Sequence, residues 1–252
     1  MTGIPVIGAK LIRRLPLAIA LALLATPAAA QSVTLDLGQS GSLSGGILQL
    51  VALTTLLSLA PGILVMVTSF TRIVVVLSFL RTAMGVQQAP PNTVMVSLAM
   101  FLTFFIMAPV LQESYEAGIK PLMEEQINEE QAFARAVAPL HKFMISHVRE
   151  QDLRLFMDMS RAPAVANTAD TPLRALVPAF MISELKRAFE IGFLLFLPFL
   201  IIDMVIASVL MSMGMMMLPP VLISLPFKLI FFVLVDGWFL VAGSLVRSFG
   251  TI

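Results

Sequence analysis

The chain has 252 residues, 58% of them hydrophobic and only 12% charged, against roughly 25% charged in an ordinary soluble domain. A soluble fold of this length cannot bury so much apolar surface, so a bilayer or a large assembly has to cover the remainder. The formal net charge of +1 says little about partners, but nucleic acid is not expected, because the Lys and Arg residues of the polar segment alternate with Glu and Asp. Cysteine is absent, which excludes disulfides and thiolate metal sites.

Residues 1–30 have the pattern of a cleavable export signal. Basic residues precede an apolar stretch from Leu15 to Ala25, and an A-x-A pattern ends at Ala30. Cleavage is therefore predicted between Ala30 and Gln31. The alternative is an uncleaved transmembrane helix, but the apolar stretch is short for a span of about 20 residues. In either case the following chain is predicted to start on the outer side of the membrane.

A polar tail is predicted for residues 31–45, followed by a first pair of hydrophobic helices over residues 46–111. The first of these runs to residue 80, and Pro61-Gly62 predicts a break or kink inside it. Residues 81–92 read as a turn.

The second helix of this pair is predicted from about Thr93 to Leu111. Asn92 or Thr93 is the expected N-cap, and Pro109 lies near the predicted end.

Charged residues are concentrated in residues 112–187, which we interpret as a helical insertion outside the membrane. Amphipathic helices are predicted from Glu124 to His147, interrupted at Pro139, and from Phe143 to Met159. A Pro/Ala-rich linker is predicted for residues 160–178. The interleaved acidic and basic side chains favour a solvated helix face over a site for a charged substrate.

The apolar pattern resumes in residues 188–252, which predict a second hairpin. Its arms are expected at Ile191–Met213 and Val221–Val246, separated by a break at residues 214–220. The predicted fold is therefore an all-α membrane protein, with two long helical hairpins flanking a soluble insertion. Counting spans from an outer N-terminus places residues 112–187 on the outer side of the membrane.

The sequence shows no sign of an enzyme. It contains neither a P-loop, nor an HExxH zinc motif, nor a GxSxG nucleophile motif. The histidines, His141 and His147, lie six residues apart and therefore about 120° off a shared helix face, so they are not expected to share a metal. No catalytic residue, metal or cofactor is predicted.

Charged residues inside the apolar segments are the first candidates for function: Arg72, Asp203, Lys228 and Asp236. Each would cost at least about 2.5 kcal/mol facing lipid at a helix centre, so they are expected to pair or to line water. In a hairpin with its tip at Leu218, Lys228 lies roughly 15 Å and Asp203 roughly 22 Å from the tip. A pair between Lys228 and Asp203 is therefore feasible, and Asp236 could meet Arg72 or another subunit. The alternative is that these charges have only a structural role and determine which helices pack together.

The second candidate is a cluster of methionines at the predicted hairpin turn, among them Met215, Met216 and Met217. Methionine usually fills irregular cores, but three in succession point in three directions and cannot share one core pocket. Between Gly214 and Pro219-Pro220 they predict a non-helical loop, which membranes tolerate only where protein covers it or it lines a cavity. A ring of such loops would make a deformable apolar constriction.

Four stretches of this sequence resemble the flagellar biosynthetic protein FliP family, which also includes SctR-type injectisome subunits: residues 178–193 (PAFMISELKRAFEIGF), 198–203 (PFLIID), 68–92 (TSFTRIVVVLSFLRTAMGVQQAPPN) and 211–220 (MSMGMMMLPP). The resemblance implies a core subunit of the type III protein export gate in the flagellar basal body. It further implies self-assembly as a pentamer with FliQ and FliR, packed in an oligomeric helical gate beside FlhA and FlhB.

The resemblance also implies roles for particular residues. Met215, Met216 and Met217 correspond to the family's pore gasket. Glu184 and Lys228 correspond to an ion pair between subunits, which competes with the Asp203–Lys228 pair. On the resemblance we prefer Glu184 as the partner of Lys228 and keep Asp203 as the second choice. Phe143 and Phe156 correspond to positions of self-association.

Other functions remain open at this stage. A virulence injectisome subunit is the nearest alternative, although the N-terminal signal favours the flagellar one. A solute transporter would explain the buried charges, but no repeat relates the two helix pairs. A purely structural scaffold is the third alternative.

Overall fold

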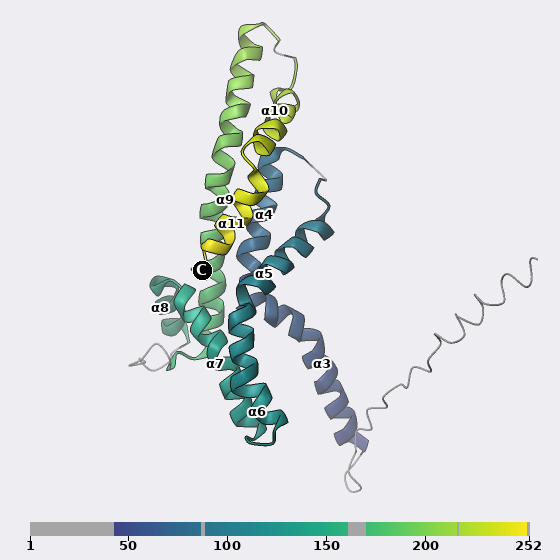
Figure 1. Ribbon diagram of the computed structural model, residues 1–252, viewed down its shortest axis with the longest axis vertical. Coiled ribbons are helices and arrows are strands. Elements are labelled where there is room, and N and C mark those ends of the chain that lie inside the picture. The colour runs from purple at the N-terminus through teal and green to yellow at the C-terminus, as the bar shows by residue number, and fades with distance from the viewer. Residues whose placement is uncertain (1–42, 87–88, 161–169, 216, 251–252) are drawn as a thin grey trace, which may run out of the picture. The chain divides into compact units, whose positions relative to one another are not determined.

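The computed structural model describes residues 43–86, 89–160, 170–215 and 217–250, and the regular elements among them are all helical (Figure 1). They are α3 (Leu43–Val67), α4 (Phe70–Met84), α5 (Asn92–Ser114), a π-helical segment (Tyr115–Ile119), α6 (Lys120–Met123), α7 (Glu129–His147), α8 (Glu150–Met159), α9 (Leu173–Ser212), α10 (Pro220–Leu234) and α11 (Gly237–Arg247). The helical class is thus confirmed for these residues. The predicted signal and its cleavage site at Ala30 and Gln31 lie outside them.

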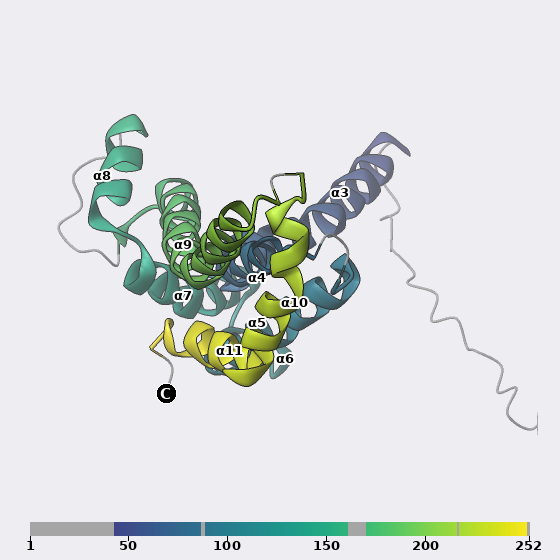
Figure 2. The same ribbon diagram turned by 90° about the horizontal axis from the view of Figure 1, so that it is seen from above.

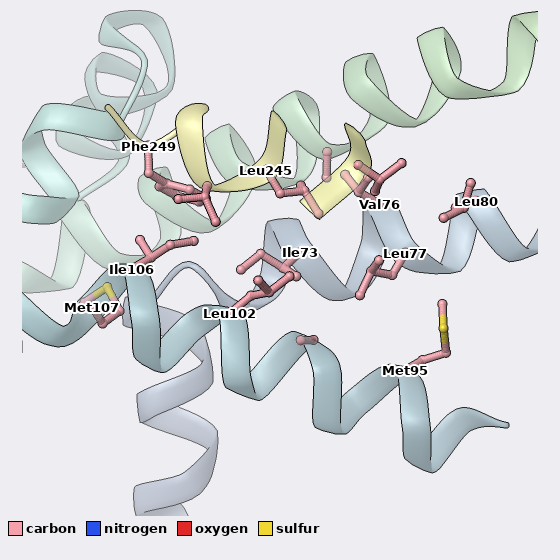
Figure 3. Packing of buried hydrophobic residues seen from close by; sticks show 14 of the residues in the cluster. Ile73, Val76, Leu77, Leu80, Met95, Leu102, Ile106, Met107, Leu245 and Phe249 are labelled. Atoms are coloured by element: carbon pink, nitrogen blue, oxygen red, sulfur yellow. The ribbon is translucent and has the colours of Figure 1, made fainter. Parts of the chain in front are cut away.

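The core is built around α4, which packs against both α9 and α5 (Figures 1 and 2). Its buried apolar residues recur every three or four positions, the spacing of one helix face: Ile73, Val76, Leu77 and Leu80. Figure 3 shows them beside the buried face of α5, which contributes Met95, Leu102, Ile106 and Met107. Because lipid tails are as apolar as these side chains, close packing rather than removal from water stabilises the contact in a membrane.

No break occurs at Pro61-Gly62, because α3 continues to Val67, while the alternative of a kink there stays a prediction. A proline removes only one backbone donor, and such a loss is tolerated inside apolar helices. The chain breaks instead at Thr68 and Ser69, where the Thr68 hydroxyl competes with the helix for a backbone partner. The Thr68 hydroxyl accepts a hydrogen bond from the backbone N–H of Phe70 at 3.4 Å.

The helix predicted over 93–111 is longer than expected. α5 begins at Asn92 and passes through Pro109 to Ser114, and the π-helical segment and α6 continue it, so that Asn92–Met123 forms one helical rod of 32 residues. The predicted cap is also wrong, because Pro91 occupies the N-cap position and the amide oxygen of Asn92 accepts a hydrogen bond from Arg81.

The insertion contains the two predicted helices with different boundaries. α7 begins at Glu129, after Asn128 caps it by accepting the backbone N–H of Gln131 at 2.9 Å. The predicted interruption at Pro139 does not occur, since this residue is buried within a continuous helix. The actual break falls at residues 148–149, before α8, so the helix predicted to begin at Phe143 is divided there.

The second hairpin has one continuous arm and one bent arm. α9 begins at Leu173, inside the predicted linker, and runs for 40 residues. The other arm, predicted as one span over Val221–Val246, is divided into two helices: α10 and α11 meet at a bend of 63°. At the bend Asp236 adopts φ 51°, a left-handed conformation that Asp tolerates better than most residues.

Apolar length identifies candidate membrane spans among the described residues. The rod Asn92–Met123 and α9 are long and apolar enough to cross a bilayer, and the bent pair α10–α11 would make a third span if it counts as one. The sequence predicted four apolar segments, but the first of them, which was predicted to run to residue 80, is divided into α3 and the 15-residue α4. In the most apolar stretch of α9 only 11% is buried within this chain, so lipid or other subunits have to cover the rest.

Candidate functional site

The methionine-rich turn lies between α9 and α10, and its described residues are non-helical as predicted. Gly214 ends α9 with φ 74°, while Gly214 N–H donates to Met211 and Met215 N–H donates to Leu210. These bonds form a Schellman cap, for which glycine is the favoured residue. Met217 is 98% exposed and Met215 44% exposed, so the described part of the chain leaves Met217 almost uncovered and covers Met215 only in part.

Lys228 lies in α10, and its ammonium group donates to the Asp203 carboxylate of α9 at 2.6 Å. It also donates to the backbone oxygen of Ala83, at the end of α4, at 3.3 Å. The other Asp203 oxygen accepts a hydrogen bond from Ser224. The structure therefore brings together the two charges that helical rise alone made feasible. This cluster, which we call the hairpin pin, ties both arms of the hairpin to α4.

Glu184 lies in α9, where it pairs with Arg72 of α4 rather than with Lys228. The Arg72 Nε donates to Glu184 Oε2 at 2.8 Å, and the two side chains are 1% and 0% exposed. The alternative partner considered for Arg72, Asp236, is exposed at the bend of α10–α11. A contact between Glu184 and Lys228 of different subunits stays a prediction. Such a contact would either add to the pairs that Glu184 and Lys228 form within this chain or replace them.

A third polar cluster next to Glu184 was not predicted from the sequence. The hydroxyl of Ser183 donates to the Asp152 carboxylate at 2.6 Å and accepts the backbone N–H of Arg149 at 3.0 Å. The Arg149 side chain also donates to Asp152, at 2.8 Å from Nε. This cluster fixes the start of α8 to α9, so two adjacent residues of α9, Ser183 and Glu184, hold two other helices, α8 and α4.

The sequence interpretation of a solvated charged face therefore fails for two carboxylates. Asp152 is 7% exposed and Glu184 is fully buried. The sequence did not indicate that these two carboxylates are buried, because each has charged neighbours in the sequence. The partner of Glu184 is 112 positions away, and the partner of Asp152 lies three positions away, as in an ordinary exposed pair on a helix.

The residues matched to self-association lie in different environments. Phe143 is 6% exposed, and its ring lies 5.9 Å from that of Phe180 and 6.0 Å from that of Phe249. Phe156 is half-buried on α8. Phe143 therefore shapes the core of the single chain, while Phe156 retains surface that a second copy could contact. Their role in self-association stays a prediction.

The histidines contact separate parts of the backbone. His141 Nε2 lies 2.8 Å from the Thr171 carbonyl oxygen, and His147 Nδ1 lies 2.8 Å from that of Phe143. Across the described ranges, no group of three or more His, Cys, Asp or Glu side chains is arranged to hold a metal ion.

Fold and site together define a class: a helical protein with membrane-length apolar helices, an exposed methionine loop and buried ion pairs at its helix contacts. The chain belongs to the FliP family, whose sequence model matches residues 53–245. It is 63% identical to the flagellar biosynthetic protein FliP of Caulobacter vibrioides over 233 residues, covering 92% of this chain and 88% of that protein. It is 56% identical to the FliP of Bacillus subtilis, covering 80% and 91% respectively. The FliP of Rhizobium meliloti is 51% identical, with 88% and 93% covered.

Proposed function

We propose that this chain is a core pore subunit of the flagellar type III protein export gate. It conducts unfolded flagellar proteins across the inner membrane and seals the pore when export is idle. Family membership supports the flagellar role, and the observation that carries the pore role is the exposed methionine loop between two apolar arms. The subunit acts by shape and packing, without catalysis.

The loop is suited to a seal because of its side-chain chemistry. Methionine is unbranched, flexible and polarizable, so several copies can close around an irregular gap and part again. Met215 and Met217 are exposed in this chain, as a residue that meets its counterpart in neighbouring subunits has to be. An apolar constriction of this kind blocks hydrated ions by dewetting, while a passing polypeptide displaces the thioethers.

The hairpin pin supports a seal at a reproducible position. Lys228 holds α10 to Asp203 of α9, and its bond to Ala83 holds both arms to α4. The loop is therefore carried by two arms that cannot slide past each other without breaking a partly buried ion pair.

The uncovered apolar surface supports an assembly. Side chains of α9 such as Phe193, Leu194 and Ile201 are 64%, 64% and 59% exposed. Copies of this chain, proposed to form a pentamer, together with FliQ and FliR, cover this surface, while FlhA and FlhB lie beside the gate. Residues 112–187 form the periplasmic part.

A substitution series tests the seal. Replacing Met215, Met216 and Met217 together by alanine should let ions or small molecules leak through the closed complex, measured as membrane depolarisation in cells. Deleting the same three residues should leak more strongly. The matched control replaces Met123 and Met159 by alanine, since they are 72% and 69% exposed but lie outside the loop.

The outcomes separate the candidate functions. No leak from the triple variant, or an equal leak from the control, contradicts the seal. Loss of motility in a deletion strain supports the flagellar role over an injectisome one. Crosslinking of a stalled export substrate to position 216 excludes a pure scaffold, while substrate-dependent current through the purified chain alone would support a solute transporter.

A further inference from the structure

Arg72 uses its guanidinium group for more than its pair with Glu184. Its Nη1 donates to the backbone oxygen of Ser248 at 3.0 Å and to the Ser248 hydroxyl at 2.9 Å. Ser248 directly follows α11. The planar fork of arginine is suited to serving two acceptors at once, whereas a lysine ammonium is a point charge on a flexible stem. One buried cation therefore joins α4, α9 and the segment after α11.

Phe249 completes this arrangement. Its ring lies 3.7 Å below the guanidinium carbon of Arg72, in cation–π geometry, and the residue is 4% exposed. Its carbonyl oxygen lies 3.3 Å from Nε2 of His147, at the end of α7. Figure 3 shows Phe249 and Leu245 over the same part of the core as Ile73 and Ile106.

The rest of α11 is packed less closely. A pocket of about 80 Å³ remains between α11, α4 and α9, lined by residues that include Val76, Leu195 and Leu245. At its other end α11 meets α10 at the 63° bend. The packing along α11 therefore leaves space, and the contacts of Arg72 with Ser248 and Phe249 hold the end of this arm in place.

We propose that Arg72 is a positioning residue that, with Glu184, Ser248 and Phe249, forms a clamp holding the α11 arm against α4 and α9. The hairpin pin holds α10 at Lys228, and the clamp holds the far end of α11, so the bend at Asp236 lies between two fixed points. This inference goes beyond the proposed export function and does not depend on it.

Single reporter cysteines in the full chain, in its membranes, test the clamp, because the natural chain has no cysteine. Val246→Cys is the reporter, since Val246 is 8% exposed beside the clamp and should react slowly with a maleimide. Arg247→Cys, at an exposed position, should react fast in every background. Met95→Cys, at a 5% exposed position on α5, reports on the rest of the core.

Two substitutions should open the clamp. Arg72→Lys keeps a charge opposite Glu184 but loses the fork and the stacking, and Phe249→Leu keeps an apolar side chain but loses the aromatic face. Each should speed labelling of Val246→Cys by about five- to thirty-fold, the effect of losing one cation–π contact and its hydrogen bonds. Phe249→Tyr keeps the aromatic face and should restore slow labelling.

Phe199→Leu is the matched control, because Phe199 is 3% exposed in the same core but does not touch Arg72. It should leave labelling at position 246 unchanged. The proposal is overturned if neither clamp variant speeds labelling there. It is also overturned if positions 246 and 95 accelerate together in both variants, because that would show general loosening rather than release of one arm.

Discussion

Arg72 and Glu184, 112 positions apart in the sequence, form a buried ion pair, and the residue before Glu184, Ser183, binds the start of α8. One turn of α9 therefore joins the apolar core to the charged insertion. Removing one partner of a buried pair is expensive because the other charge is left without compensation.

Glu184→Gln should therefore lower the free energy of unfolding by about 3–5 kcal/mol, since a neutral amide cannot balance the buried Arg72. Replacing both residues, Arg72→Met with Glu184→Leu, should cost less than the single change. Thermal unfolding of the purified chain in detergent measures both. A double variant less stable than the single one would contradict this account.

Charge exchange identifies the partner of Lys228. Lys228→Glu places two carboxylates together and should abolish export, because breaking such a pair costs about 2–5 kcal/mol. Adding Asp203→Lys should restore motility, whereas adding Glu184→Lys should not. The opposite pattern of rescue would assign Lys228 to Glu184 of a neighbouring subunit.

Ser183→Ala should lower the free energy of unfolding by about 1–3 kcal/mol, because it leaves the Asp152 carboxylate and the Arg149 N–H short of a partner. Ser208→Ala is the control on the same helix, since that exposed hydroxyl only bonds back to Met204. The rates at which a protease cleaves the two variants at α8 can be compared by limited proteolysis. Equal sensitivity of the two variants would show that the Ser183 cluster does not anchor α8.

Gly192 is required by the close approach of α9 to α4. A Cβ atom there would lie 2.6 Å from Phe79 Cδ2, so Gly192→Ala should destabilise the chain by about 1–3 kcal/mol. Gly243→Ala, where a Cβ meets nothing within 4 Å, should be neutral or stabilising. Adding Phe79→Ala should recover part of the loss at Gly192. Equal thermal unfolding temperatures for the two glycine variants would contradict the steric explanation.

Helix positions followed from the sequence better than helix ends did. Apolar runs placed α5, α9 and the methionine turn, because their composition leaves few alternatives to apolar helix. Proline misled at Pro61, Pro109 and Pro139, since each loses one hydrogen bond that the surrounding helix can spare. Next to the bend at Asp236, the ring of Phe232 lies 2.1 Å from where a Cβ of Gly237 would lie, and no local pattern shows that contact.

The sequence by itself determined the helical class, the family and the chemistry of the exposed turn, because composition and local motifs carry that information. It also showed that the charges at Arg72, Asp203 and Lys228 need partners, since an unpaired charge in an apolar segment is too costly. Only the tertiary structure decided who those partners are. Glu184 lies 112 positions from Arg72, and the bond from Lys228 to Ala83 spans 145. Such pairings depend on how helices pack across the core, which no local spacing records.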